Sequence, residues 1–106
     1  MSETLDLVKQ LIARGEIRIS EHGYDELAAD GLSVSEILAG VGAAQVVEDY
    51  PQYGKGPCVL VLQHDQNGEG IHVLWGIAGK SKTPAVLVTS YRPDPAKWSR
   101  DFRTRL

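Results

Sequence analysis

The feature of this chain that most constrains its fold is a change of hydrophobic periodicity near residue 44. In the first part, apolar residues recur at helical spacing, as Leu5, Val8 and Leu11 do. After residue 44 the apolar residues alternate with polar ones or form short continuous runs, which is typical of strands. Helices followed by an antiparallel sheet predict the α+β class.

Helices and one short strand are expected before residue 44. A first helix is predicted over residues 4–14, and the alternation in residues 17–19 indicates a short strand. Ser20 is a suitable N-cap for a second helix that runs to about residue 30. Ser33 and Glu36 match a capping box, so a third helix is expected from there to about residue 41.

The second part of the chain predicts a four-stranded, mainly antiparallel sheet. Turn-forming residues separate its apolar segments, so a meander is expected. The predicted strands are residues 45–50, 58–64, 71–78 and 85–92. Asp94 and Pro95 are typical of a helix start and predict a short C-terminal helix over residues 95–105. We expect these elements to form a single domain over residues 1–106.

Length and composition are those of one ordinary globular domain. The chain has 106 residues, of which 42% are hydrophobic and 24% charged, so neither a second core nor a disordered chain is expected. No apolar run reaches the roughly 18–20 residues that a membrane helix needs, and the N-terminus lacks a basic and apolar leader pattern. We therefore expect a cytoplasmic protein with no membrane partner. The single cysteine, Cys58, excludes an internal disulfide and a thiolate-cluster zinc site.

Charge is unevenly distributed along the chain. Residues 1–70 hold four Lys or Arg against twelve Asp or Glu, a charge of −8, whereas residues 71–106 hold seven against two, a charge of +5. A basic C-terminal third is suited to contact phosphates, although a solvated helix face with this charge is at least as common. The candidates for nucleic-acid binding are Arg18, Lys97, Arg100 and Arg103.

Two histidines are candidates for catalysis, because histidine titrates near neutral pH. His22 lies where a helix is expected to begin, and there the helix dipole favours the neutral imidazole that a general base requires. It can equally be a histidine that bonds its own helix turn. His72 alternates with Ile71 and Val73 in a strand. It is a site residue if its face of the sheet is open, and a hydrogen-bonded core residue if helices cover that face.

Tyr91 and Arg92, at the end of the last predicted strand, are the other two catalytic candidates. Arginine binds phosphate bidentately, whereas tyrosine at a strand end is most often a packing residue with a solvated hydroxyl. Trp75 and Trp98 could stack on bases, although a lone tryptophan is more often a core or interface residue. His64 is expected at a turn, and no third ligand stands at a supportive spacing. We therefore expect no metal site and no cofactor.

Five short segments, in this order and spacing, resemble a known family. They are RISEH (18–22), GLSVSEI (31–37), VVEDYP (46–51), IHV (71–73) and VTSYRPD (88–94). Together they resemble domain-of-unknown-function family 4258 over about residues 16–100. That family is placed near the RelE/ParE-like toxin fold, so the resemblance implies helices packed on one face of a small antiparallel sheet.

The resemblance also implies an activity: the toxin of a toxin–antitoxin pair, cleaving RNA or ribosome-bound message without a metal. In that mechanism His22 or His72 removes the ribose 2′-hydroxyl proton, and the other histidine protonates the leaving oxygen. Arg92, assisted by Arg18, would stabilise the phosphate, and Tyr91 would orient it. The mechanism requires both histidines and Tyr91 to line one concave surface.

The alternative is a non-catalytic module that offers a sheet edge or its acidic helical face to a protein partner such as an antitoxin. Glu26 and Asp30 stand where the family often has arginine, and they favour this alternative, as does the net charge of −3. The oligomeric state cannot be read from the sequence.

Overall fold

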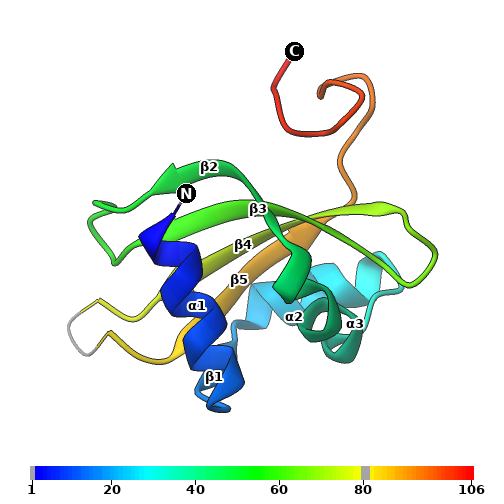
Figure 1. The fold of residues 1–106 in the computed structure, drawn as a ribbon. Helices are drawn as coiled ribbons and strands as arrows, with labels where there is room; N and C mark the ends of the chain where they lie inside the picture. The colour runs from blue at the N-terminus through cyan, green and yellow to red at the C-terminus, as the bar shows by residue number, and fades with distance from the viewer. Residues whose placement is uncertain (1, 80–81) are drawn as a thin grey trace.

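The computed structural model describes residues 2–79 and 82–106. Its helices pack on one face of a five-stranded sheet (Figure 1), which confirms the α+β class. In chain order the elements are α1 (Glu3–Ala13), β1 (Ile17–Ile19), α2 (Glu21–Ala29), α3 (Val34–Gly40), a 3₁₀ turn η1 (Val41–Ala43), β2 (Gln45–Tyr50), β3 (Cys58–His64), β4 (Gly70–Ile77) and β5 (Ala85–Tyr91). In these two ranges, no helix has the length and apolar character needed to cross a membrane.

Serine side chains begin the three α-helices. The hydroxyls of Ser2, Ser20 and Ser33 each accept a hydrogen bond from the backbone amide three residues further on, at 2.9–3.2 Å. The helix starts predicted at Ser20 and Ser33 are therefore confirmed. Gly15 and Gly31, which follow α1 and α2, have φ angles of +75° and +65°. Glycine adopts this conformation without steric cost, so the chain can turn sharply after each helix.

The sheet has the strand order β1-β5-β4-β3-β2. Strands β2 to β5 form the predicted antiparallel meander. The predicted number of four strands is wrong, because β1 joins the same sheet in parallel with β5, pairing Ile17 with Ala85. Periodicity indicates a strand at residues 17–19, but a segment of three residues carries no information on which distant strand it will pair with.

The predicted helix over residues 95–105 is wrong. This stretch is a series of turns with an isolated bridge between Trp98 and Arg105. The carboxylates of Asp94 and Asp101 accept hydrogen bonds from backbone amides two residues further on. Such local bonds compete with the helical hydrogen-bond pattern, which explains why good N-cap chemistry at Asp94 does not produce a helix.

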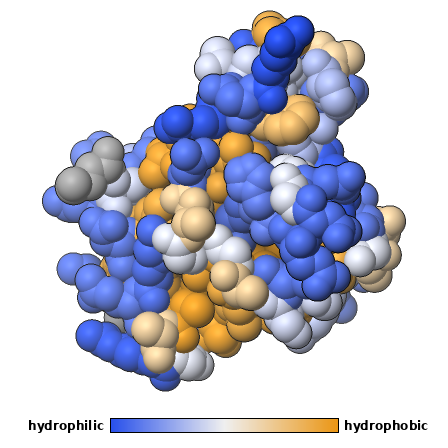
Figure 2. Space-filling model, turned by 45° about the vertical axis from the view of Figure 1, so that its right-hand side comes forward, coloured by the Kyte–Doolittle hydropathy of each residue, from blue (hydrophilic) through white to orange (hydrophobic). Residues whose placement is uncertain are grey.

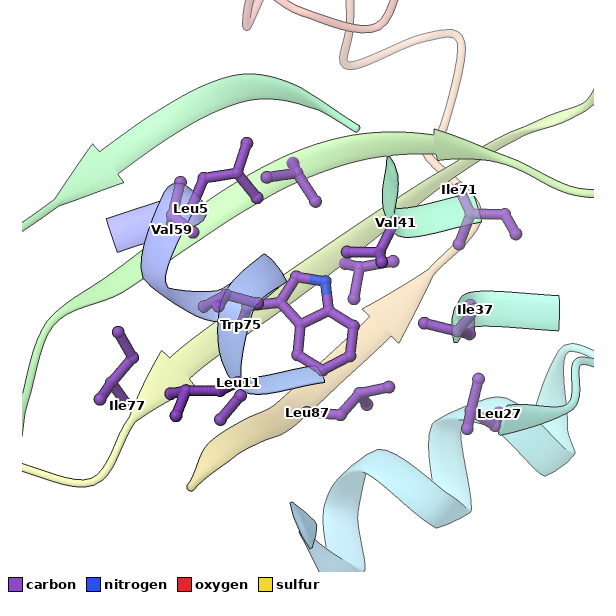
Figure 3. Packing of buried hydrophobic residues seen from close by; sticks show 14 of the residues in the cluster. Leu5, Leu11, Leu27, Ile37, Val41, Val59, Ile71, Trp75, Ile77 and Leu87 are labelled. Atoms are coloured by element: carbon purple, nitrogen blue, oxygen red, sulfur yellow. The ribbon is translucent and has the colours of Figure 1, made fainter. Parts of the chain in front are cut away.

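The hydrophobic core lies between the helices and the inner face of the sheet (Figure 3). Trp75 of β4 is at its centre and has no exposed surface. Its indole Nε1 donates to Oε1 of Gln63 at 3.0 Å, and Nε2 of Gln63 donates to the Ile37 carbonyl at 2.8 Å. These two bonds satisfy the buried polar groups. Trp75 is thus a core residue that cannot stack on bases. The buried cluster consists of Leu5, Val8, Leu11, Leu27, Leu32, Ile37, Val41, Val59, Val61, Ile71, Val73, Trp75, Ile77, Ala85 and Leu87.

The opposite face of the sheet, here called the open face, carries no helix among the described residues. The buried residues of α1, α2 and α3 share the core cluster with Val73 and Trp75. Since successive strand residues point to opposite faces, His72 and Leu74 point to the open face. The C-terminal segment, residues 93–106, folds over one end of this face. In Figure 2 it stands at the top of the molecule with a mostly hydrophilic surface.

Candidate functional site

His72 lies on the open face with no exposed surface, and both of its ring nitrogens are hydrogen-bonded. Its Nε2 is 2.6 Å from the carbonyl oxygen of Phe102, and its Nδ1 is 3.1 Å from the hydroxyl oxygen of Tyr91. A carbonyl oxygen can only accept, so Nε2 carries the proton and donates it. Nδ1 therefore accepts from the Tyr91 hydroxyl. This pattern assigns the neutral Nε2–H tautomer to His72.

Burial keeps both members of this pair uncharged. Desolvation lowers the pKa of His72 below its usual value, although the bond to the Phe102 carbonyl opposes the shift. Desolvation also raises the pKa of the Tyr91 hydroxyl. At neutral pH the site thus contains a neutral imidazole that holds a protonated phenol in one orientation.

The C-terminal segment closes over this pair. The ring of Trp98 meets the ring of His72 edge to face, with centroids 4.4 Å apart. The guanidinium of Arg105 lies 4.6 Å from the centroid of Trp98. Its Nε and Nη2 donate to the two carboxylate oxygens of Glu48, on β2, at 2.8 and 3.0 Å. We call Glu48, His72, Tyr91, Trp98 and Arg105 the open-face cluster.

Glu48 and Arg105, the two charged residues of the open-face cluster, form a bidentate ion pair. Hydrogen bonds from Arg105 lower the pKa of Glu48, against a smaller opposing effect of burial. The Tyr50 hydroxyl donates a further bond to Glu48 at 2.7 Å. Arg105 in turn has its pKa raised by Glu48 and stays protonated. A carboxylate and a guanidinium therefore lie beside a neutral imidazole and a phenol.

His22 is not part of this cluster. It lies in the first turn of α2 with its side chain 66% exposed, and its Nε2 is 3.6 Å from Oε1 of Glu26. Helix α2 packs on the inner face through Gly23 and Leu27, whereas His72 points to the open face. The predicted shared surface for the two histidines is therefore wrong. The sequence indicates which helix or strand each histidine belongs to, but it does not indicate on which face of the sheet that helix packs.

Arg92 is also separate from the cluster. Its Nη2 donates to Oδ2 of Asp65 at 2.9 Å, and its Nη1 is 3.7 Å from Oε2 of Glu69. Asp65 has a side chain only 2% exposed. The hydrogen bond from the Glu69 amide lowers the pKa of the Asp65 carboxyl, and the bond from Arg92 lowers it further. Arg92 thus neutralises a buried carboxylate at the β3–β4 turn, which is a structural role.

The basic candidates for nucleic-acid binding lie in two places. Arg18 is exposed on the edge strand β1. Lys97, Arg100 and Arg103 belong to the C-terminal segment and are exposed. Arg103 also donates from Nη2 to the Val46 carbonyl at 3.3 Å. The second group thus shares a segment with the open-face cluster.

Sequence reasoning missed Glu48 and Arg105. They stand 57 positions apart and meet only because the C-terminal segment folds back over β2. One signal was present: an acidic residue in a strand whose neighbours Val46 and Val47 are apolar. Within residues 2–79 and 82–106, no three His, Cys, Asp or Glu side chains are grouped to hold a metal ion.

The fold and the site together define an α+β domain with helices on one face of its sheet and a cluster of ionisable groups on the other. Residues 19–92, well over half of the chain, match the family described as "Domain of unknown function (DUF4258)". The chain belongs to this family. No curated protein and no solved structure matches it.

Proposed function

We propose that this protein is the toxin of a toxin–antitoxin pair and a metal-independent endoribonuclease that cleaves RNA at the open-face cluster. The observation that carries the proposal is the convergence of a carboxylate, a phenol and a guanidinium around His72 on the open face, which bears no helix among the described residues. The sequence also resembles a family that is placed near the RelE/ParE-like toxins, and this resemblance, which is independent of the geometry, supports the same activity.

The cluster has the groups that phosphodiester cleavage needs. The ionised Glu48 carboxylate would accept the proton of the ribose 2′-hydroxyl as its oxygen attacks phosphorus. Arg105 uses Nε and Nη2 for Glu48, and its remaining N–H groups would bind the phosphate oxygens and stabilise their developing charge. Its side chain is 63% exposed, so RNA can reach it.

The leaving group would take its proton from Tyr91. In the resting site the single hydrogen of the Tyr91 hydroxyl is donated to Nδ1 of His72. As the P–O bond to the 5′-oxygen breaks, this hydrogen would turn from Nδ1 to that oxygen, leaving a 5′-hydroxyl, a 2′,3′-cyclic phosphate and the Tyr91 phenolate. His72, which has no exposed surface, acts through Tyr91 and is a positioning residue. This assignment replaces the predicted roles of His22 and Arg92, which lie outside the open-face cluster.

Cleavage of single-stranded RNA by the purified protein in EDTA tests this proposal. Glu48→Gln should slow turnover by about 10²–10⁴-fold, the usual effect of losing a general base. The matched control is Asp49→Asn, which removes the charge of the exposed neighbour on the same strand. Arg105→Ala should weaken both RNA binding and turnover, since a phosphate contact serves ground and transition states alike. Absence of cleavage by the unaltered chain, on free RNA and on ribosome-bound message, would refute the proposal.

A protein-interaction module without catalysis is the second candidate. It is favoured by the bonding of His72 and Glu48, which already have partners within the chain. Strand β2 ends the described sheet order and offers an edge for strand addition. Tight binding to a protein encoded in a neighbouring reading frame, with no RNA cleavage under any condition, would establish this candidate instead.

A further inference from the structure

A groove of about 510 Å³ crosses the open face at the end away from the C-terminal segment. Its floor includes Leu74, Gly76, Val86 and Val88, from β4 and β5. Because the side chains of Leu74, Val86 and Val88 point away from the core, the groove belongs to the open face, which no helix of the described residues covers. We call it the cross-strand groove.

The groove follows one row of paired residues across all five strands. Tyr50 pairs with Cys58, Cys58 with Gly76, Gly76 with Val86, and Val86 with Arg18. Adjacent strands are about 4.8 Å apart, so the row is about 19 Å long. Gly76, in the middle strand, has no side chain to fill the row. A Cβ atom there would lie 3.3 Å from Cγ2 of Val88, and its absence deepens the groove.

The rim of the groove is cationic and aromatic. Arg18 and Lys55 line it, together with Tyr50 and Tyr53, which are 41% and 55% exposed. None of its described lining residues is acidic, although the whole chain has a net charge of −3. The surface is therefore complementary to a ligand that is both apolar and negatively charged.

We propose that the cross-strand groove binds a short segment of a partner protein in which apolar residues are interspersed with acidic ones. A row of about 19 Å accommodates roughly six extended residues. The floor is aliphatic and suits aliphatic side chains, whereas the aromatic rings and the guanidinium on which RNA bases could stack stand at the rim. The groove is not an enclosed cavity, which suits a peptide better than a small molecule that must bury most of its surface.

This surface is separate from the open-face cluster but next to it. Tyr50, at one end of the row, donates its hydroxyl hydrogen to Glu48. A bound segment would therefore lie beside the proposed catalytic carboxylate. The binding itself does not require that the protein cleave RNA, so the two proposals can be tested apart.

The test uses eight-residue peptides and the methyl NMR signals of Leu74, Val86 and Val88. One peptide alternates Leu with Glu, a second alternates Leu with Lys, and a third alternates Ser with Glu. We expect that, of the three peptides, only the Leu/Glu peptide shifts these methyl signals. Lys55→Glu should weaken its binding by about tenfold. Lys9→Glu, an equal charge change on helix α1, should leave the binding unchanged.

Gly76→Ala gives a second readout, because its added methyl group occupies the floor of the groove. The substitution should weaken the binding of the Leu/Glu peptide, while the methyl signals of residues outside the groove keep their positions. Equal shifts by the Ser/Glu peptide would overturn the proposal, since apolar recognition would then be absent. Shifts caused by an eight-nucleotide RNA but by no peptide would assign the groove to RNA, and no shift with any probe would also overturn it.

Discussion

The hydroxyl of Tyr91 donates to Nδ1 of His72 across 3.1 Å, while the opposite ring nitrogen of His72 donates to the carbonyl of Phe102. The imidazole thus links the last strand to the C-terminal segment through its two sides. Because the bond from Tyr91 requires an unprotonated Nδ1, the neutral form of this one buried side chain maintains the geometry of the open-face cluster.

Replacing Tyr91 with Phe should separate the chemical step from RNA binding. We expect turnover to fall by about 10²–10⁴-fold, because the donor to the leaving oxygen is lost, with little change in KM. The free energy of unfolding should fall by about 1–3 kcal/mol, because Nδ1 of buried His72 loses its hydrogen-bond donor. Tyr24→Phe, at an exposed position of α2, is the control. A loss of RNA affinity without a change in turnover would contradict the role given to Tyr91.

Stability should decrease as the pH falls below about 6.5, the ordinary pKa of histidine. The pKa of folded His72 is below that value, so protons bind more readily to the unfolded chain and favour it. The loss of stability begins as the pH falls to the pKa of histidine in the unfolded chain, and it is complete only below the pKa of folded His72. Urea denaturation at about pH 7.5 and 5.5 measures it. The same slope in His72→Gln would show that another group is responsible. The carboxylates of Glu48 and Asp65 become protonated and lose their interactions only at lower pH, at and below about 4, because the pKa values of both groups are lowered.

Gly23→Ala should destabilise the fold, although alanine ordinarily favours helices. A Cβ atom at Gly23 would lie 2.8 Å from the carbonyl oxygen and 2.9 Å from Cδ2 of Leu87, so α2 would have to move away from β5. We expect a loss of about 1–3 kcal/mol in the free energy of unfolding, the range for overpacked cores. In Gly42→Ala the added methyl group meets nothing within 4 Å, and that variant should be as stable as the original chain. Equal stability of both variants would show that α2 can shift freely.

Arg92→Ala should lower the thermal stability without changing RNA cleavage. It leaves the buried carboxylate of Asp65 without its guanidinium partner. Differential scanning calorimetry should record a lower Tm, whereas the initial rate of cleavage should stay within twofold, about the scatter expected for a residue outside the site. Double substitution of Arg92 and Asp65 by Ala and Asn should recover part of the Tm. A large fall in turnover would instead return Arg92 to the catalytic site.

Local chemistry explains which parts of the fold could be predicted from the sequence. Serine caps mark the starts of α2 and α3, and period-two patterns mark β2 to β5, because both depend on neighbouring residues. The pairing of β1 with β5 and the meeting of Glu48 with Arg105 depend on packing between distant segments. The expected helix over residues 95–105 is absent for a related reason, because Trp98 is buried against His72, a contact with a distant strand that the pattern of neighbouring residues does not indicate.

In the candidate site, too, the features that depend on neighbouring residues could be predicted, whereas those that depend on distant segments could not. Alternation with Ile71 and Val73 correctly separates His72 from the core face, and strand pairing brings it beside Tyr91. His22 and Arg92 have the right chemical character for the predicted mechanism, but the sequence does not show that α2 packs on the inner face or that Arg92 pairs with the buried Asp65.

The parallel pairing of β1 with β5 also bears on how the chain reaches its native state. The Ser20 hydroxyl, at the junction of β1 and α2, donates to the Val88 carbonyl, 68 positions further along the chain. Loop closure of this length is entropically unfavourable until the intervening hairpins have shortened the path. We therefore expect β2 to β5 to assemble first and the amino-terminal helices to dock late in folding. Substitutions in β1 should then accelerate unfolding while leaving the folding rate nearly unchanged.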